Sequence, residues 1–293
     1  VIDSGLMFPE EDMLGIDIVI PDITYLLENR ERVRGIVLTH GHEDHIGSLP
    51  YVLRELDVPV YGTKLTLGLL QGKLKEFGIN YARLFTIKPL DSVHIGCFKV
   101  EFFRVSHSIP DAVGLAIHSP VGIIMHTGDF KFDQTPIDGE VTDFHKIAEI
   151  GDQGVLVLLS DSTNVERPGY TFSEKNVGGT FDDVFRSAKE RIIVASFASN
   201  VHRIQQVIDV SYKHRRKVAV VGRSMVNVVG VADDLGYLTI PDGTLIDLEE
   251  ISNYPPNQVT ILTTGSQGEP MSALTRMAMG EHKKINICTG DTI

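Results

Sequence analysis

Cysteine is scarce in this sequence. Cys97 and Cys288 are the only two among 293 residues, and they lie far apart without the spacing of a metal-binding motif. This pattern argues against a secreted domain held by several disulfides and is typical of a reduced, cytoplasmic protein. We expect both thiols to be reduced and to lie in the core, with a disulfide between them as the alternative.

Long hydrophobic runs are also missing. No window approaches the roughly 18 uncharged apolar residues that a membrane span requires, and no charged segment followed by an apolar one resembles a secretion signal. Low-complexity stretches are absent, whereas the hydrophobic share of 42% is normal for a globular protein. The sequence therefore predicts a cytoplasmic protein without a membrane partner, with a core large enough for one big domain or two medium ones.

Positive charge is in deficit. Lysine and arginine total 27 against 39 aspartates and glutamates, which makes the net charge −12. This excludes a protein that coats nucleic acid through bulk charge, but not an enzyme with a local basic groove, since bound divalent cations offset acidity at a site. One basic run, at 213–217, favours a solvated helix end because cations stabilise helix C-termini, with RNA contact as the alternative.

Both ends of the sequence read as structured elements. The first residue is Val1, which opens an apolar pair, and residues 285–293 read as a strand that stops without a tail. We therefore expect the chain to be a fragment of a longer protein.

Secondary-structure signals divide the chain into two regions. The first shows short strands with few helices between them, which predicts stacked sheets with outer helices. The second alternates strands with helices, which predicts a mostly parallel sheet with helices on both faces. The boundary falls within 169–179, which follows Pro168 and contains Gly169, Gly178 and Gly179. Expected strands are 35–39, 58–61, 98–105, 113–118, 122–126, 155–159, 192–196, 218–222, 259–264 and 285–288, and expected helices are 48–56, 65–77, 181–191, 201–214, 225–235 and 270–279.

The strongest chemical signal is a histidine-rich stretch at 40–45, which reads His-Gly-His-Glu-Asp-His between an apolar strand and a helix. Imidazole nitrogens and carboxylate oxygens suit zinc, or manganese and iron where oxygen ligands are more numerous. In a tight loop at a strand end, His40 and His42 can face one ion while Asp44 and His45 face a second. The alternatives are a single structural zinc and a surface loop, although structural zinc sites favour cysteine.

Two later residues can complete these ligand sets. His107 and Asp129 each follow the end of an apolar strand, and Gly128 allows a close approach of the backbone beside Asp129. A carboxylate at such a position can bridge two cations about 3.5–4 Å apart. We therefore predict that all six side chains converge in one pocket.

Together these residues resemble the ordered motifs of the metallo-β-lactamase fold. The longer forms His-Gly-His-Glu-Asp-His-Ile-Gly at 40–47 and His-Thr-Gly-Asp-Phe-Lys at 126–131 resemble the branch that carries an inserted β-CASP domain and processes nucleic acids. The stretches 5–9, 160–164 and 264–270 are similar to the bacterial ribonuclease J family within that branch. The resemblance covers essentially the whole chain.

The resemblance implies a fold for each region. Residues 1–172 would form an α+β metallo-β-lactamase αββα sandwich, incomplete in this chain, and residues 173–293 an α/β β-CASP domain with a mostly parallel sheet, truncated at its C-terminus. Further histidines are implied after the β-CASP domain, one completing the second metal site and one acting as general acid or phosphate ligand. Nothing in this sequence matches them, so we expect the chain by itself to hold one metal tightly and one weakly, and to cleave little RNA.

The resemblance also implies two Zn²⁺ ions, with Mn²⁺ or Mg²⁺ as alternatives. It assigns six side chains to them. The implied metal ligands are His40, His42 and His107 for the first ion, Asp44 and His45 for the second, and Asp129 as the bridge between them.

Three carboxylates have further implied roles. Asp3 would orient the ligands of the histidine-rich stretch from behind. Asp161 would orient a metal-binding histidine, with a helix or turn cap as the alternative. Catalytic roles accordingly fall to Asp44 and Asp161.

Three loops of the second region, at 196–200, 222–224 and 264–268, each join an expected strand to an expected helix. The carboxyl ends of parallel strands lie at one edge of a sheet, where ligands bind, and helix N-termini offer N–H groups to phosphate. We expect this edge to be a wall of an RNA channel, with ordinary turn capping as the alternative. The residues predicted to contact RNA are Ser199, Arg203, Arg223 and Ser266.

The leading hypothesis is a zinc-dependent ribonuclease. The resemblance implies that a metal-bridging hydroxide hydrolyses RNA phosphodiester bonds, with 5′-to-3′ exonuclease action on 5′-monophosphorylated RNA and endonuclease activity, in RNA maturation and decay that includes ribosomal RNA. It further implies a homodimer or higher homo-oligomer. The alternatives are a hydrolase of thioesters or lactams on the same fold and a non-catalytic RNA-binding homologue.

Overall fold

A computed structural model describes residues 1–10, 12–269 and 271–293 of the chain. The chain packs as two compact units. Unit 1 comprises Val1–Gln134 and Glu140–Thr171, and unit 2 comprises Thr135–Gly139 and Phe172–Ile293. Within the described residues, no helix is both long enough and apolar enough to cross a membrane.

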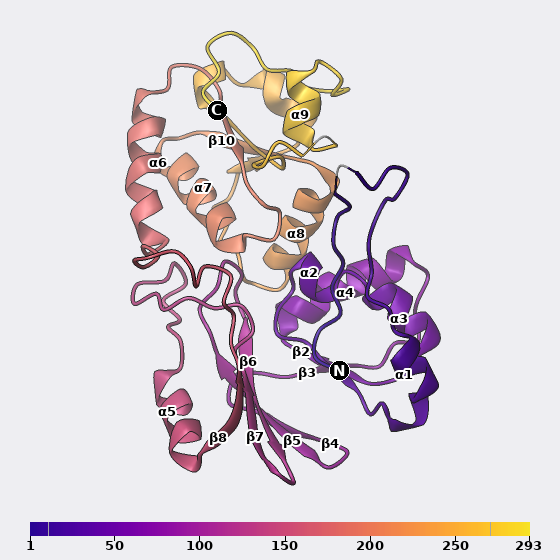
Figure 1. Ribbon diagram of the computed structural model, residues 1–293. Coiled ribbons are helices and arrows are strands. Elements are labelled where there is room, and N and C mark those ends of the chain that lie inside the picture. Colours follow the sequence, from indigo (N-terminus) through magenta and orange to yellow (C-terminus); the bar gives the residue numbers. More distant parts are fainter. Residues whose placement is uncertain (11, 270) are drawn as a thin grey trace. The chain divides into compact units, whose positions relative to one another are not determined.

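Unit 1 contains two sheets of short strands, together with mostly short helices (Figure 1). In chain order its helices and strands are α1 (Thr24–Glu28), β1 (Ile36–Val37), α2 (Glu43–Ile46), α3 (Leu49–Glu55), β2 (Val60–Gly62), α4 (Lys64–Glu76), β3 (Leu84–Thr86), β4 (Ser92–Ile95), β5 (Phe98–Arg104), β6 (Val113–Ser119), β7 (Gly122–His126), α5 (Phe144–Gln153) and β8 (Val155–Leu159). One sheet has the order β1-β2-β3 and is parallel. The other has the order β4-β5-β6-β7-β8 and is antiparallel except between β7 and β8.

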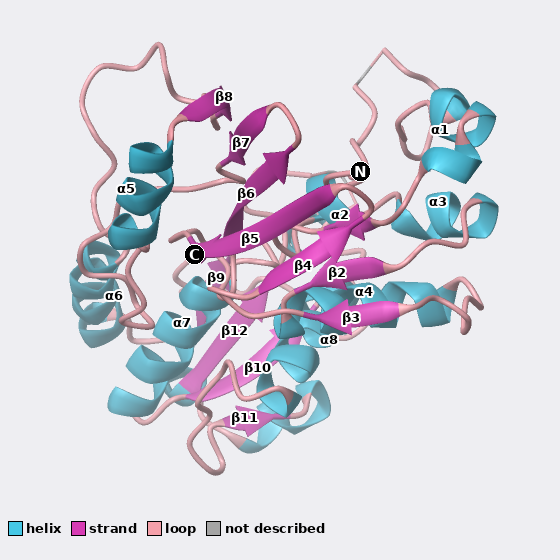
Figure 2. Ribbon diagram, turned by 90° about the horizontal axis from the view of Figure 1, so that it is seen from below, coloured by secondary structure: helices cyan, strands magenta, loops and turns pink. Residues whose placement is uncertain are grey.

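The two sheets of unit 1 pack through a shared apolar core. Val37 of β1 lies in one cluster with Phe102 of β5 and Leu115 of β6. On the other face of the five-stranded sheet, Phe103 packs with Ile150 of α5, because neighbouring residues of a strand point to opposite faces. With α4 packed against β3 (Figure 2), the layers run helix, sheet, sheet, helix, and the predicted αββα sandwich is confirmed.

Unit 2 alternates strands and helices around one sheet (Figure 2). In chain order its elements are α6 (Lys175–Ser187), β9 (Ile192–Ala195), α7 (Val201–Lys213), β10 (Lys217–Val221), α8 (Arg223–Asp234), β11 (Leu245–Ile246), the 3₁₀ turns η2 (Leu248–Asn253) and η3 (Pro256–Gln258), β12 (Val259–Thr263) and α9 (Ala273–Ala278). The strand order is β11-β10-β12-β9, and every neighbouring pair is parallel. The predicted parallel sheet is therefore confirmed.

Helices cover both faces of this sheet. Ile193 of β9 packs with Met277 of α9 on one face. Its neighbour Ile192 packs with Phe185 of α6 and Val210 of α7 on the other. Successive residues of one strand thus supply both halves of the unit 2 core.

Two predicted elements of unit 2 differ from the structure. The helix expected at 181–191 is α6, which starts at Lys175 and runs through Gly178 and Gly179, because its apolar face packs on α7 and β9. The strand expected at 285–288 is absent from the described residues. The helix expected at 270–279 is α9, and its expected first residue lies outside the described residues.

Tertiary contacts explain the missing strand at 285–288. The Ile285 side chain is buried in the core, but the following backbone turns back at Cys288, whose N–H donates to Asp291 Oδ2 at 2.7 Å. The pairing with β9 is made instead by Thr292, which bridges to Ile192. Apolar side chains here fill the core without a strand.

The prediction that both cysteines lie in the core is wrong. Cys97 and Cys288 are free and exposed. Cys97 lies with Gly96 in the two-residue turn between β4 and β5, where Ile95 pairs with Phe98, and Cys288 lies in the turn closed by Asp291. Tight turns project such side chains into solvent.

An ionic cluster joins α5 to the five-stranded sheet of unit 1. Glu101 of β5 is 2.8 Å from Lys146 of α5 and also pairs with Lys99. Burial would raise the pKa of Glu101, but these lysines lower it to about 2. The ionised carboxylate therefore stabilises the fold above its unfolded pKa, about 4.3, and that stabilisation is lost as pH falls toward 2.

We expect Glu101→Gln to lower the free energy of unfolding by about 1–3 kcal/mol at pH 7, because hydrogen bonds to charged groups are lost. Urea denaturation at pH 7 and pH 3 measures this, and the deficit should shrink at pH 3. Glu149→Gln is the control, since Glu149 binds the same lysine from a 49% exposed position and should change stability little. An equal deficit at both pH values would contradict the role of the Glu101 charge.

Candidate metal centre

The histidine-rich stretch spans the turn after β1 and the start of α2, with His40 and His42 in the turn and Asp44 and His45 in the helix. The N-terminal segment runs directly behind it, and the Ser4 N–H donates to the His45 carbonyl at 2.7 Å. A Cβ at Gly5 would come within 1.6 Å of the Asp44 carbonyl oxygen. Only glycine therefore permits this backbone-to-backbone packing, which fixes the position of α2.

Asp3 and Thr39 orient two of the histidine rings. Asp3 accepts hydrogen bonds from the Thr39 N–H at 2.8 Å and the Thr39 hydroxyl at 2.7 Å. Asp3 Oδ2 lies 2.8 Å from His45 Nδ1, and Thr39 Oγ1 lies 3.0 Å from His40 Nδ1. Because each Nδ1 is engaged from behind, the Nε2 atoms of His40 and His45 are left facing Asp129.

One group of possible ligands gathers side chains from three segments of unit 1. His40, His42, His107 and Asp129 each offer one atom, and these atoms lie within 4.8 Å of one another. His107 Nε2 is 3.2 Å from His42 Nδ1. Burial lowers the pKa of His107, and lowers that of His40 well below its usual value. Both rings are therefore neutral, which is the form that binds metal ions.

A second group shares Asp129 and adds Asp44 and His45. His45 Nε2 lies 3.8 Å from Asp44 Oδ2 and 3.4 Å from Asp129 Oδ1. The Asp44 side chain is 70% exposed, so this side of the cluster opens to solvent.

The electrostatics of the second group favour positive charge. Burial would lower the pKa of His45, but hydrogen bonds and charges of Asp129 and Asp3 raise it to about 10. The hydrogen bond from His45 in turn lowers the pKa of Asp129. At neutral pH the His45 ring is therefore protonated and lies between two carboxylates, and a metal ion bound by its Nε2 would take the place of that proton.

Asp129 faces both groups with different oxygens. Oδ2 lies 4.0 Å from His40 Nε2 and 3.8 Å from His107 Nε2, whereas Oδ1 faces His45. Gly128, just before it, has φ +59°, and a Cβ there would come within 3.0 Å of the Val113 carbonyl oxygen. The turn after β7 therefore needs glycine to bring this carboxylate between the groups.

The residues fit a divalent cation. His40 Nε2 is buried and has no hydrogen-bond partner among the described residues, although buried polar atoms are normally satisfied. A cation would satisfy this atom, and the nitrogen and oxygen donors around it are those of zinc and related metals. The fold and this cluster together point to a divalent metal.

Asp161 lies at the edge of the same region. Its N–H donates to Thr127 Oγ1 at 2.9 Å, and its Oδ1 accepts from the N–H and hydroxyl of Thr163. Its charge also acts on His107, where it opposes the effect of burial on the pKa. The structure thus shows a turn cap close to a candidate ligand.

The sequence analysis missed three side chains that support the cluster. Thr39 connects Asp3 to His40, as described above. His126 Nδ1 accepts from the Gly128 N–H at 3.0 Å, and Ser108 Oγ lies 3.3 Å from His42 Nε2. Thr39 and Ser108 are adjacent to predicted ligands, and His126 is the first residue of the motif at 126–131, which is the signal that could have identified them.

In unit 2, the three loops expected to contact RNA follow β9, β10 and β12. These strands are parallel neighbours, so the loops lie at one edge of the sheet. Ser199 is partly buried, while Arg223 and Ser266 are exposed. Arg203 instead donates to Glu174 Oε2 at 2.7 Å and to Gln206, so its guanidinium already holds α6 and α7 together.

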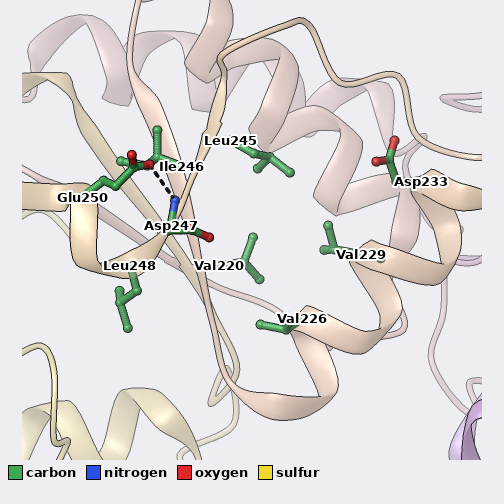
Figure 3. Close-up of a pocket in the computed structure, with 10 residues that line it drawn as sticks. Val220, Val226, Val229, Asp233, Leu245, Ile246, Asp247, Leu248 and Glu250 are labelled. Carbon is green, nitrogen blue, oxygen red and sulfur yellow. Dashed lines mark hydrogen bonds between the residues drawn. The ribbon is translucent and has the colours of Figure 1, made fainter.

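A separate hollow of about 380 Å³ in unit 2 lies between α8, β10, β11 and η2 (Figure 3). Most of its lining side chains are apolar, with Val226 and Val229 of α8 among them, and the charged ones are all acidic. Asp247 N–H donates to Glu250 Oε2 at 3.2 Å, which engages one of these carboxylates. A hollow of this character does not suit phosphate.

We expect Asp3→Asn to weaken metal binding about 10- to 100-fold, as is usual when a partner behind a ligating histidine is lost. Asparagine tolerates the left-handed φ of +53° at this position, so the backbone should be unchanged. Competition titration of Zn²⁺ against a chromogenic chelator measures the affinity. Asp22→Asn is the control, because Asp22 only caps α1 through Thr24. Unchanged affinity in Asp3→Asn would rule out the orienting role.

Comparison with known protein families covers both units. The metallo-β-lactamase superfamily model matches residues 1–185, and the model for the ribonuclease J β-CASP domain matches residues 189–293. A solved structure of a protein of unknown function from Enterococcus faecalis has a TM-score of 0.63 over 100% of this chain and 83% of its own, at 16% identity. That likeness concerns the fold alone.

Curated relatives are similar along the whole chain. Ribonuclease J of Synechocystis is 52% identical, ribonuclease J2 of Bacillus subtilis 51% and ribonuclease J of Thermus thermophilus 50%, each over 100% of this chain. The alignments cover 46%, 53% and 52% of those proteins. The chain therefore spans about half the length of the curated relatives it matches.

Proposed function

Because the chain belongs to the metallo-β-lactamase superfamily and continues into a ribonuclease J β-CASP domain, we propose that it is the metal-binding part of a ribonuclease that hydrolyses RNA phosphodiester bonds. The observation that carries this proposal is Asp129, which turns one carboxylate oxygen toward each of the two ligand groups. We place the boundary between the two domains after residue 172.

The proposed centre takes two Zn²⁺ ions, with Mn²⁺ or Mg²⁺ as alternatives. Bound there, the cations would polarise the scissile phosphate and lower the pKa of the attacking water. His40, His42 and His107 hold the first position, and Asp44 and His45 the second. The neutral rings of His40 and His107 offer lone pairs, while the carboxylates of the second group balance positive charge.

The surrounding side chains keep these ligands in place. Asp3 and Thr39 fix the Nδ1 sides of His40 and His45, so that their Nε2 atoms point inward. We assign a catalytic role to Asp44, whose exposed carboxylate can reach a substrate at the open side. Asp161 acts on His107 through its charge and holds the adjacent turn.

RNA is the proposed substrate, since the relatives at about 50% identity are named ribonuclease J. We propose 5′-to-3′ exonuclease action on 5′-monophosphorylated RNA together with endonuclease cleavage, in a cytoplasmic homo-oligomer. In the β-CASP domain, Ser199, Arg223 and Ser266 are the proposed RNA contacts. Arg203 contributes less, because Glu174 already neutralises it.

The test compares hydrolysis of end-labelled 5′-monophosphorylated RNA, a thioester and nitrocefin by the whole protein, with and without EDTA. We expect cleavage of RNA alone, release of mononucleotides from the 5′ end, and loss of activity in EDTA that Zn²⁺ or Mn²⁺ restores. Hydrolysis of the thioester or nitrocefin alone would identify another metallo-hydrolase. Binding of RNA without cleavage would identify a non-catalytic homologue.

A further inference from the structure

A second hollow in unit 2 is lined by basic side chains. It has a volume of about 430 Å³ and lies between the end of α7 and the loop before β11. Binding pockets for small ligands start at about 300 Å³. Its lining residues are Tyr212, Lys213, Arg215, Arg216 and Lys217 on one side and Asp242, Gly243 and Thr244 on the other.

Part of this basic run has a structural explanation. Lys213 and His214 each lie 2.8 Å from Asp182 of α6, so they pair α7 with its neighbouring helix. Lys217 donates to the Gly243 carbonyl and lies 5.6 Å from the centre of the Tyr254 ring. These contacts agree with the solvated helix end that the sequence favours.

Arg216 is different, because its charge is buried without a carboxylate partner. The residue is 4% exposed, and its guanidinium donates to the carbonyl oxygens of Ala188, Glu190 and Val259. No ion pair of Arg216 occurs among the described residues, and burial lowers its pKa. These carbonyls lie before β9 and at the start of β12, on the other side of β10 from β11, so the Arg216 guanidinium is held there and its neighbours supply the charge that is open to the hollow.

Arg215 supplies a cation that is not engaged in this way. Its side chain is exposed and makes no ion pair or hydrogen bond among the described residues. Its backbone has φ +55°, a left-handed conformation that glycine or asparagine adopts more easily at the end of a helix. An arginine at this position therefore places positive charge at the edge of the hollow, in a backbone conformation that is unfavourable for it.

Tyr212 adds an aromatic surface to the same wall. Its side chain is 58% exposed, three residues before Arg215. Exposed aromatic rings beside cations are the elements on which single-stranded nucleic acids stack their bases while their phosphates are neutralised. Asp242 is the opposing charge in the lining, and it is outnumbered.

We propose that this hollow binds one nucleotide unit of single-stranded RNA, with its base on Tyr212 and its phosphate against Arg215. The proposal rests on the proposed function, since that function brings RNA to the protein. The hollow precedes β10 and β11, at the amino edge of the parallel sheet, whereas the loops proposed above follow the strands at the carboxyl edge. It is therefore a separate contact from those loops.

The test measures binding of a short fluorescent oligoadenylate to the whole protein in EDTA by anisotropy, over a range of salt concentrations. Arg215→Glu should weaken binding about 10-fold or more, as expected for a lost charge-assisted contact, and reduce the salt slope by about 1. Tyr212→Ala should weaken binding about 5-fold or more through lost stacking. Asp242→Asn should tighten it.

Lys283→Glu is the matched control, because Lys283 is an exposed lysine of unit 2 that does not line the hollow. It makes the same change in net charge as Arg215→Glu and should leave the affinity near that of the wild type. Equal weakening by both charge reversals, or none by Arg215→Glu, would overturn the site. AMP as a competitor distinguishes the two sources of the nucleotide. Displacement of the oligoadenylate by AMP supports a pocket for a free nucleotide unit. Weaker oligoadenylate binding in Arg215→Glu, without displacement by AMP, supports a contact along the strand.

Hydrolysis of 5′-monophosphorylated RNA with metal present is followed in parallel. Binding that depends on Arg215 without any hydrolysis would reject the proposed function and leave the hollow in place. Hydrolysis together with Arg215→Glu binding as tight as wild type would reject the hollow and leave the proposed function in place.

Discussion

Asp129→Ala should empty the candidate centre of metal, whereas His107→Ala should leave about one ion bound. The Asp129 carboxylate contributes to both ligand groups, and His107 contributes to one. Removal of the Asp129 carboxylate also takes away part of the negative charge that surrounds His45. Since bound cations supply several kcal/mol of transition-state stabilisation, RNA hydrolysis by the whole protein should fall by about three orders of magnitude or more.

Metal counts by mass spectrometry on purified variants decide between these outcomes. Asp152→Ala is the control, because Asp152 is an exposed acid of the same unit outside both ligand groups. Asp129→Asn keeps the shape of the side chain and removes its charge, so it should also lose metal. Equal metal content in Asp129→Ala and His107→Ala would show that Asp129 does not bridge.

Asp291→Ala should lower the free energy of unfolding of unit 2 by about 3–5 kcal/mol, the usual loss when one partner of a buried ion pair is removed. The Asp291 side chain is 2% exposed and accepts from Arg191 Nε at 2.9 Å and from a terminal nitrogen of the same guanidinium. Arg191 also donates to the Asn286 carbonyl. The pair therefore docks the segment after α9 against the start of β9.

Urea denaturation followed by far-ultraviolet circular dichroism measures this loss. Asp183→Ala is the control, since Asp183 forms an exposed pair with Arg186 and should change stability by less than about 1 kcal/mol. The double variant Arg191→Met/Asp291→Leu should recover most of the loss, because it leaves no buried charge unpaired. A loss in Asp291→Ala no larger than that of the control would show that the pair contributes little.

Much of the candidate centre was predictable because its chemistry is local in the sequence. His40 and His42 lie two residues apart in a strand-end turn, where spacing alone suggests a ligand set. His107 and Asp129 are predictable in the same way, since each follows an apolar strand. The hydroxyl of Thr39, which joins Asp3 to His40, could not be predicted, because that contact depends on how the N-terminal segment folds back.

The fold was predictable where apolar patterning matched an element, as in β5, β6 and β10. It was less predictable where tertiary packing decides the backbone. Ile285 is buried as an apolar residue should be, yet the following segment is a turn. For α5 the signal was present and overlooked: Asp143 caps the Lys146 N–H at 3.0 Å, and the buried Ile150 lies on its core-facing side.

The candidate centre also bears on how the protein is made. Its parts are far apart in the sequence of unit 1, since Asp3 precedes β1 and Asp129 follows β7. Contacts between such distant segments form late because chain entropy opposes them. A nascent chain that exposes the histidine-rich stretch alone presents an incomplete ligand set. Metal capture would then follow synthesis of the first seven strands, and the bound ions would act as a reversible crosslink that stabilises the folded state by mass action.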